Sequence, residues 1–453
     1  MRLLLPFFAS AALMLAQEAL TINAAVELAQ NKYPSVQISL EQVAAASASV
    51  ALARTTFLPR ADFLAQVNRA SHNNVYGLIL PQSVIPAISG PVLDNSKLRN
   101  SWGTAVGILV SWEPYDFGLR KAGVDAASAT KRRAELSVQR TKFEVAAAAA
   151  DSFLTILAAR KNIAVAEAAL ERTRQLDTIV GALTKAELRP GADLSRIKAE
   201  QTVATTFLIQ AKQSEEVARA ALAQFLGLTA ATVEVTGARF DQLPVATPPD
   251  SNATDHPAVA EQQAAIEEVK SRLLILDKSF YPKFSTQGAL YGRGTGASLI
   301  GPDQGGANGL GPNIGNWALG LNMTWAILDF KSLRVKKEIE SANERKEAAR
   351  ANLMNAEIHG NADKALAMIN GARQIAAVTP NQVAALKILL EQSTVRYKSG
   401  LGTLIEVADA QRMLAQAEVD DSIARLNVWR AQLSLAIALG DLKPFLELTK
   451  DTK

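Results

Sequence analysis

Long stretches of the chain repeat apolar residues every three or four positions, and much shorter stretches alternate apolar with small or polar residues. The first pattern predicts helices. Residues 118–185 contain no proline and only three glycines, so they predict one helix of more than 60 residues, about 100 Å long. Pro380 is the one residue that argues against an equally long helix in the second half. The predicted helices are 22–56, 118–185, 193–226, 258–279, 332–397 and 403–439.

The same order of elements occurs twice, which predicts a duplicated structural unit. Tyr33-Pro34-x-Val36 recurs as His256-Pro257-x-Val259, and Phe57-Leu58-Pro59-Arg60 recurs at the same offset as Phe280-Tyr281-Pro282-Lys283. Trp112-x-x-x-Asp116-Phe117 recurs at a slightly shorter offset as Trp325-x-x-x-Asp329-Phe330, and Leu226-Gly227 recurs at that shorter offset as Leu439-Gly440. We therefore predict a first repeat, a proline-rich linker, a second repeat and a tail: 17–228, 229–255, 256–440 and 441–453.

The alternating segments predict two β-hairpins, over 61–112 and 284–325. Between Trp102 and Trp112 one face is apolar and the other is mostly glycine, alanine and serine, and 317–325 alternates in the same way. Ten steps of extended chain span about 33 Å, and a tilt near 40° reduces this to about 25 Å of height, which matches the apolar band of a membrane barrel. The alternative is a soluble sandwich in which these faces pack together. Four of the five tryptophans bound the apolar faces: Trp102, Trp112, Trp317 and Trp325.

Four strands cannot close a membrane barrel, because bacterial barrels have at least eight. An open sheet edge in lipid leaves backbone groups without hydrogen bonds, so the protomer is expected to oligomerise. Two copies give eight strands and a filled interior, whereas three give twelve and a lumen. Small residues on the inward face favour three copies. The helices alone leave a long antiparallel coiled coil without a pore as an alternative.

Composition excludes several other classes of function. The chain has no cysteine, three histidines that are far apart, and 48 basic against 44 acidic residues. We therefore expect no thiolate or clustered-histidine metal site, no cofactor, no nucleic-acid partner and no enzyme activity. Gly292-x-Gly294-x-Gly296 is a weak candidate for a phosphate-binding loop, because no predicted helix follows it directly.

The N-terminus has the features of a secretory signal peptide over residues 1–16. Arg2 precedes an apolar run that ends in small or apolar residues before Gln17-Glu18. A buried N-terminal helix is the alternative interpretation. No later segment has the roughly 20 apolar residues that a transmembrane helix needs, so we expect the mature chain to have none.

The duplicated halves, the Phe-Leu-Pro-Arg and Phe-Tyr-Pro-Lys motifs and the two Trp-x-x-x-Asp-Phe motifs resemble the TolC-like outer-membrane efflux protein family. The resemblance covers nearly the whole mature chain. It implies a mainly α fold with a small membrane β-barrel portion, in which a homotrimer forms a twelve-stranded barrel in the outer-membrane lipid above a periplasmic α-barrel. It also implies the exit duct of a tripartite efflux pump or type I secretion system. The partners would be a periplasmic adaptor and an inner-membrane RND, ABC or MFS transporter.

The resemblance also implies roles for individual residues. Glu406 and Asp409, three residues apart on one helical face, would line the periplasmic pore constriction beside Tyr397. Thr403-x-x-Glu406 is also a capping box, so both acids are explained equally by the start of a helix. The adaptor would dock at the tips formed by Arg189, Pro190, Gly191, Gly400 and Gly402, and the four tryptophans would form the membrane-interface girdle.

The sequence departs from the family where relatives hold the closed pore with a polar link. Tyr397 matches the family's tyrosine, but its arginine position falls on Gly402 and its aspartate position on Ser195, so we expect that link to be absent. Two other classes stay open. A periplasmic adaptor would have one helical hairpin with a β-domain between its halves, and a structural coiled coil would have no tryptophan-bounded strands.

Overall fold

The computed structural model describes residues 19–71, 100–244, 256–296 and 305–450, so the predicted signal peptide lies outside the described residues. The chain forms two compact units. One contains residues up to 43, 134–263 and the part from 349 onward, and the other contains 44–133 and 264–348. The elements in chain order are α1 (Ile22–Lys32), α2 (Pro34–Thr55), β1 (Arg60–Ser71), β2 (Asn100–Tyr115), α3 (Leu119–Lys185), α4 (Gly191–Leu226), α5 (Pro257–Ser279), β3 (Lys283–Thr295), β4 (Ile314–Thr324), α6 (Phe330–Lys398), α7 (Leu404–Leu439) and α8 (Lys443–Leu448).

The single helix predicted over 22–56 is two helices, α1 and α2, separated by Tyr33. Thr21 caps α1 by accepting a hydrogen bond from the Ala24 backbone N–H. Tyr33 takes an extended conformation because the proline that follows it disfavours the helical region for the preceding residue. Pro34 then begins α2, where its missing N–H costs no helical hydrogen bond.

Among the helices in the described part of the chain, α2 alone is long and apolar enough by composition to cross a membrane, with a mean hydropathy of 1.3. Length and composition do not separate a membrane span from a helix of a soluble body. The counterpart of α2 in the second repeat, α5, carries charged residues such as Glu261, Glu268 and Arg272. That position in the repeat therefore does not require an apolar helix.

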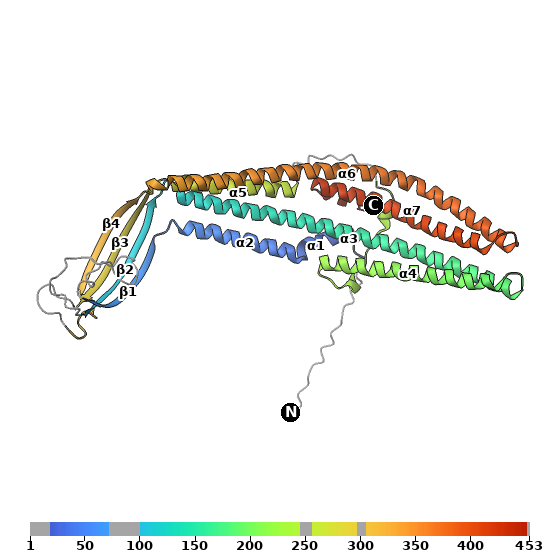
Figure 1. Cartoon of the computed structure of the whole chain (residues 1–453), viewed down its shortest axis with the longest axis horizontal. Coiled ribbons are helices and arrows are strands. Elements are labelled where there is room, and N and C mark those ends of the chain that lie inside the picture. The colour runs from blue at the N-terminus through green and yellow to red at the C-terminus, as the bar shows by residue number, and fades with distance from the viewer. Residues whose placement is uncertain (1–18, 72–99, 245–255, 297–304, 451–453) are drawn as a thin grey trace, which may run out of the picture. The chain divides into compact units, whose positions relative to one another are not determined.

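Two very long helices each turn into a shorter returning helix, and the pairs lie side by side (Figure 1). Helix α3 has 67 residues and α6 has 69, and α6 runs through Pro380 without ending. The returning helices α4 and α7 each have 36 residues and end at a glycine in the left-handed conformation, Gly227 and Gly440. These two glycines are separated by the same offset as the tryptophan motifs, so they occupy equivalent positions in the two repeats.

The main core lies in the first compact unit and is built largely from alanine, leucine and phenylalanine. Ala146, Ala149 and Ala150 of α3 are fully buried, which permits close approach of neighbouring helices, and Phe153 and Leu154 continue the same buried face. The fifth tryptophan, Trp429 of α7, is also fully buried in this cluster, and its indole N–H donates to the Gln242 carbonyl at 2.9 Å. Unlike the other four tryptophans, it is a core residue.

The second unit contains one antiparallel sheet with the strand order β1-β2-β3-β4. The two predicted hairpins are therefore joined edge to edge through β2 and β3. Strand β3 continues through Gly292 and Gly294 to Thr295, so the candidate phosphate-binding glycines belong to a strand. A Cβ on Gly294 would lie 2.0 Å from the Gly311 carbonyl oxygen, so close backbone packing explains that glycine.

Candidate functional site

The turns that end the two long helices have the same backbone structure. In the first, Glu187 has a positive φ of 59°, and Leu188 N–H donates to the Leu183 carbonyl at 3.0 Å. In the second, Gly400 has a φ of 81°, and Leu401 N–H donates to the Arg396 carbonyl at 2.9 Å. Glu187 corresponds to Gly400 and Leu188 to Leu401 at the offset of the tryptophan motifs. The duplication therefore extends to the hydrogen bonds of the tips.

All four helices of these hairpins meet in a small core just behind the turns. The core contains Val180 of α3, Ile197 of α4, Tyr397 of α6, and Leu404 and Val407 of α7, all of them buried. Packing of these side chains holds the end of the first hairpin against the end of the second. Any separation of the two tips would expose this apolar cluster.

A polar contact crosses between the hairpins at the same place. The Tyr397 hydroxyl donates to Oδ2 of Asp193 at 2.9 Å. Burial and the Asp193 carboxylate raise the pKa of Tyr397 to about 12, so the hydroxyl remains a donor at neutral pH. The Arg189 guanidinium lies 4.4 Å from the centre of the Tyr397 ring and donates to the carbonyls of Tyr397 and Gly402. We call Arg189, Asp193 and Tyr397 the tip link.

Gly402 and Ser195 cannot supply the family's link, but a different polar link, which was not predicted, joins the two hairpins. The acceptor is Asp193, two residues before the expected Ser195, and the arginine comes from the first turn rather than the second. A Cβ on Gly402 would lie 3.1 Å from the Glu406 carboxylate, 3.2 Å from Cβ of Arg396 and 3.3 Å from the Tyr397 nitrogen, so a side chain at that position would require these neighbours to shift slightly. The sequence signal that was missed is the Arg189-x-x-x-Asp193 spacing within one turn.

The structure places Glu406 and Asp409 in the first turns of α7, each beside an arginine. Thr403 Oγ1 accepts from the Glu406 N–H at 3.4 Å and donates to the Glu406 carboxylate at 3.3 Å, so the prediction that Thr403 caps this helix is confirmed. Glu406 lies 4.0 Å from Arg396, and Asp409 pairs with Arg412. Both carboxylates are about half exposed. Their role in a pore stays a prediction.

The predicted docking residues are distributed over both turns. Pro190, Gly191 and Gly400 are exposed, whereas Arg189 belongs to the tip link and Gly402 is buried. The sequence analysis missed two leucines at the apex of the turns. Leu188 is 70% exposed and Leu401 is 73% exposed, and they occupy equivalent positions in the two repeats.

One face of the sheet is apolar and exposed. The register aligns one residue from each strand in a row across the sheet, and all four are at least half exposed, from 50% to 77%. The opposite face carries small and polar residues such as Asp62, Gln66 and Ala318. Leu64, which interrupts that pattern, lies opposite Gly107. The exposed row is Phe63, Ile108, Leu290 and Trp317.

The four boundary tryptophans have different surroundings. The indole N–H of Trp112 donates to the Phe57 carbonyl, and that of Trp325 donates to the Phe280 carbonyl, both at 3.0 Å. Trp317 is largely exposed, and Trp102 is half-buried under Arg69. The paired Phe and Trp motifs of the two repeats are thus joined by the same hydrogen bond.

The register also shows how these tryptophans are staggered. Ile108 and Trp112 of β2 are level, through β3, with Trp317 and Leu321 of β4. Trp317 is level with a residue of β2 that comes six positions after Trp102. Trp325 comes four positions after Leu321, the residue that is level with Trp112. Both displacements have the same direction, as expected for strands that are tilted from the membrane normal.

The described residues hold no group of three or more histidine, aspartate or glutamate side chains that could bind a metal ion. The features that stand out are a continuous exposed apolar sheet face and a pair of helical tips joined by the tip link. Together they define a membrane protein with a long helical body and a sheet that, within the described part of the chain, is open at both edges.

Comparison with known proteins gives the family. The model of the outer membrane efflux protein family matches residues 25–228 and 249–441, and the chain belongs to this family. It is 22% identical over 426 residues to the pyoverdine export outer membrane protein OpmQ of Pseudomonas putida, covering 92% of this chain and 84% of OpmQ.

Solved structures of outer-membrane channels have the same fold. The channel OprN matches with a TM-score of 0.75 and 18% identity over 92% of this chain and 89% of its own. CusC matches with a TM-score of 0.76 and 15% identity over 93% and 92%. The CmeC outer membrane channel of Campylobacter jejuni matches with a TM-score of 0.74 and 15% identity over 95% and 90%. The family assignment makes the protein an outer-membrane efflux duct with its helical part in the periplasm.

Proposed function

We propose that the protein is the exit duct of a tripartite efflux pump or type I secretion system and that it works as a homotrimer. The observation that carries this proposal is the four-stranded sheet, whose apolar face is exposed and whose edge strands, β1 and β4, are each paired on one side only. Open edges in lipid cost several kcal/mol for each unpaired backbone group. Three copies supply twelve strands, which is enough for a barrel with a lumen.

Within this proposal, the two repeats are 17–228 and 256–440, and they are joined by the linker 229–255. Each repeat contributes one hairpin to the barrel and one long helical hairpin to the periplasmic tunnel. The matched hydrogen bonds of the turns and of the Trp–Phe pairs support the equivalence of the two repeats.

The helical tips are proposed as the site at which a periplasmic adaptor docks. Leu188 and Leu401 support this role, because a large apolar side chain that is mostly exposed at the apex of a turn suits a protein partner. Pro190, Gly191 and Gly400 form the exposed backbone around them. An inner-membrane transporter of the RND, ABC or MFS class would complete the assembly.

The tip link is proposed as the contact that keeps the tunnel closed. It joins the first hairpin to the second through a buried tyrosine and a carboxylate, so opening has to break it and expose the apolar core behind it. Glu406 and Asp409 are proposed to line the constriction, with Arg396 and Arg412 reducing their negative charge.

Membrane extraction and channel recording test the duct proposal together. The full chain is expected in the outer-membrane fraction, insoluble in carbonate and extracted by detergent as a trimer. Reconstituted in a planar bilayer, the trimer should conduct ions in discrete steps. Release by carbonate, a monomeric mass in detergent, or the lack of conductance in both the unaltered protein and Tyr397→Phe would contradict the proposal and favour an adaptor or a structural coiled coil.

A further inference from the structure

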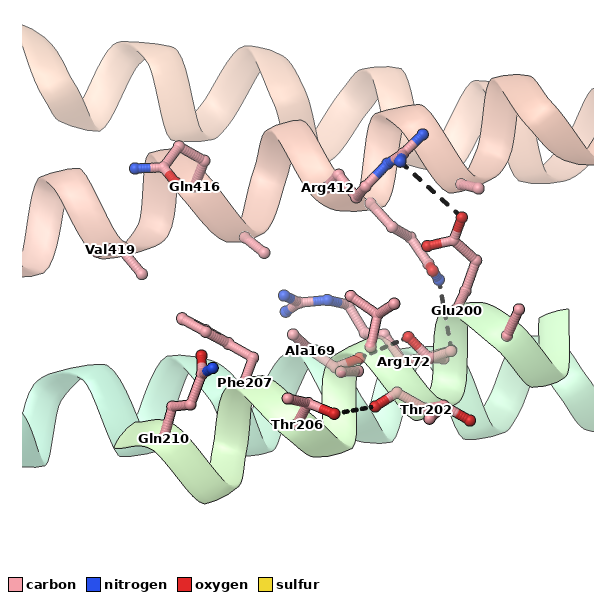
Figure 2. A pocket seen from close by; sticks show the side chains of 17 residues that line it. Ala169, Arg172, Glu200, Thr202, Thr206, Phe207, Gln210, Arg412, Gln416 and Val419 are labelled. Carbon is pink, nitrogen blue, oxygen red and sulfur yellow. Dashed lines mark hydrogen bonds and ion pairs between the residues drawn. The ribbon is translucent and has the colours of Figure 1, made fainter. Parts of the chain in front are cut away.

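A groove of about 810 Å³ lies between the first hairpin and α7 (Figure 2). Helix α3 contributes Ala169 and Arg172, α4 contributes one wall, and α7 contributes the other. The volume is in the range of cavities that bind drug-sized molecules. The groove lies away from the tip turns and the tip link. Of the residues given a function above, Arg412, the partner of Asp409, lines it.

The centre of the groove is apolar. Phe207 and Val203 of α4 are exposed along one wall, and Val419 of α7 lies on the opposite wall (Figure 2). An exposed phenylalanine ring offers a flat surface on which another aromatic ring can stack. The groove therefore suits a molecule with an aromatic body.

The charged side chains that line the groove, Arg172, Glu200 and Arg412, each have an ion-pair partner, and among the described residues the buried Nε–H of Arg172 has no hydrogen-bond acceptor. Arg172 is 2.8 Å from Glu418, and Arg412 pairs with Asp409 and lies 4.0 Å from Glu200. A charged ligand would compete with these ion pairs, and its desolvation would not be balanced by a free opposite charge. The charge arrangement therefore favours an uncharged ligand.

The remaining polar groups are threonine hydroxyls, which donate to carbonyls of their own helices, and side-chain amides. Gln411 donates to the Arg172 carbonyl at 3.4 Å, and Gln416 donates to Asp420 at 2.9 Å. Gln210 lies on the opposite wall, in α4 (Figure 2). Amides both donate and accept hydrogen bonds, so they suit an uncharged ligand with a carbonyl, amide or hydroxyl group.

The walls of the groove belong to the same two arms that the tip link joins. Asp193 and Phe207 are both on α4, and α7 follows directly after the turn that begins at Tyr397. A molecule that contacts both α4 and α7 binds most tightly when these two helices are as far apart as they are in this structure. By thermodynamic linkage, it stabilises the arrangement in which the tip link is formed.

We propose that the groove between α3, α4 and α7 binds an uncharged, drug-sized molecule with an aromatic ring, and that the bound molecule holds the two hairpin tips together. The binding goes beyond the duct function and does not depend on it. The effect on the tips rests on the gating role proposed above for the tip link.

Photolabelling with benzophenone, an uncharged two-ring ketone, tests the binding. The detergent-extracted full-length protein is irradiated over a range of benzophenone concentrations, and labelled peptides are mapped by mass spectrometry. We expect saturable labelling of 199–210 and 408–419. Phe207→Gln should raise the half-saturating concentration about three- to tenfold, because it removes the aromatic contact. Ile209→Gln, an exposed residue of the same helix that does not line the groove, should leave it unchanged.

Four results would contradict the proposal. Equal labelling of Phe207→Gln and the unaltered protein would remove the groove as the site, as would unsaturable labelling of exposed apolar residues such as Val217 and Ile375. Equally strong labelling by the anion 4-benzoylbenzoate would contradict the charge argument. The same half-saturating benzophenone concentration in Tyr397→Phe and in the unaltered protein would refute the coupling between the groove and the tips. None of these measurements depends on conductance, so failure here is distinct from failure of the duct function.

Discussion

The tip link gives the sharpest test of how the duct is held closed. Tyr397→Phe removes only the hydroxyl that donates to Asp193 and leaves the ring under Arg189. A hydrogen bond to a charged acceptor contributes about 1.5–3 kcal/mol. At about 1.4 kcal/mol per factor of ten, one lost link shifts the closed–open equilibrium at least about tenfold. Three links that open together would shift it about a thousandfold.

The assay is the open probability of single channels in planar bilayers, measured for Tyr397→Phe, Asp193→Ala and the double variant. Because both single changes remove the same hydrogen bond, the double variant should open no more than the more open single variant. Tyr33→Phe is the matched control, since the Tyr33 ring packs against Phe225 in the main core. Independent, additive effects of the two changes, or an unchanged open probability in Tyr397→Phe, would refute the link as a lock.

Three further predictions concern other parts of the molecule. Leu319→Lys on the exposed apolar sheet face should destabilise the membrane-inserted form by about 2–4 kcal/mol and reduce the yield of detergent-extracted trimer. Ala318→Lys on the opposite face should leave that yield unchanged, and equal losses of trimer would contradict the assignment of the two faces. Arg412→Ala removes the partner of Asp409 and should strengthen the block of single-channel current by trivalent cations, while Arg425→Ala should not. An unchanged block in Arg412→Ala would place Asp409 away from the conduction path. Burial lowers the pKa of His256 below its ordinary 6.5. The unfolded chain therefore binds a proton at this residue at a higher pH than the folded chain does. The contribution of neutral His256 to the free energy of unfolding is fully present above pH 6.5 and is lost as the pH falls below it. Melting temperatures at pH 7.5 and 5.5 should therefore differ less in His256→Gln than in the unaltered protein, and His359→Gln should behave like the unaltered protein.

The sequence allowed the order of the elements to be predicted because the duplicated motifs lie at their ends. The Trp-x-x-x-Asp-Phe motifs precede α3 and α6 directly, and the glycines at 227 and 440 end α4 and α7. Helix boundaries within a repeat were predicted less well. The break at Tyr33 depends on the conformation imposed by Pro34, whereas Pro380 lies inside a helix that continues, because its surroundings outweigh the lost hydrogen bond.

The contacts between hairpins could not be predicted in the same way. Alternation identified the apolar face of each strand, but the pairing of β2 with β3 joins segments that are far apart in the sequence. The stagger of the tryptophans follows from that pairing and not from either strand alone. The strand pairing and the stagger of the tryptophans thus depend on partners that are distant in sequence, and local patterns could not predict them.

The duplication explains why the arginine of the tip link lies in the first turn, a position that comparison with the family did not indicate. Arg189 and Gly402 occupy equivalent positions in the two repeats, as do Asp193 and Glu406. In both repeats an acid occupies the first turn of the returning helix, where the helix dipole favours it. In the first repeat that acid accepts from Tyr397, and in the second it is held by Thr403. The arginine expected at Gly402 is present at the equivalent position of the other repeat, where it already donates to the Tyr397 and Gly402 carbonyls. Substituting Gly402 with arginine is therefore not needed for a polar link at the tips, and its Cβ, 3.2 Å from Cβ of Arg396, would require a small shift of the turn.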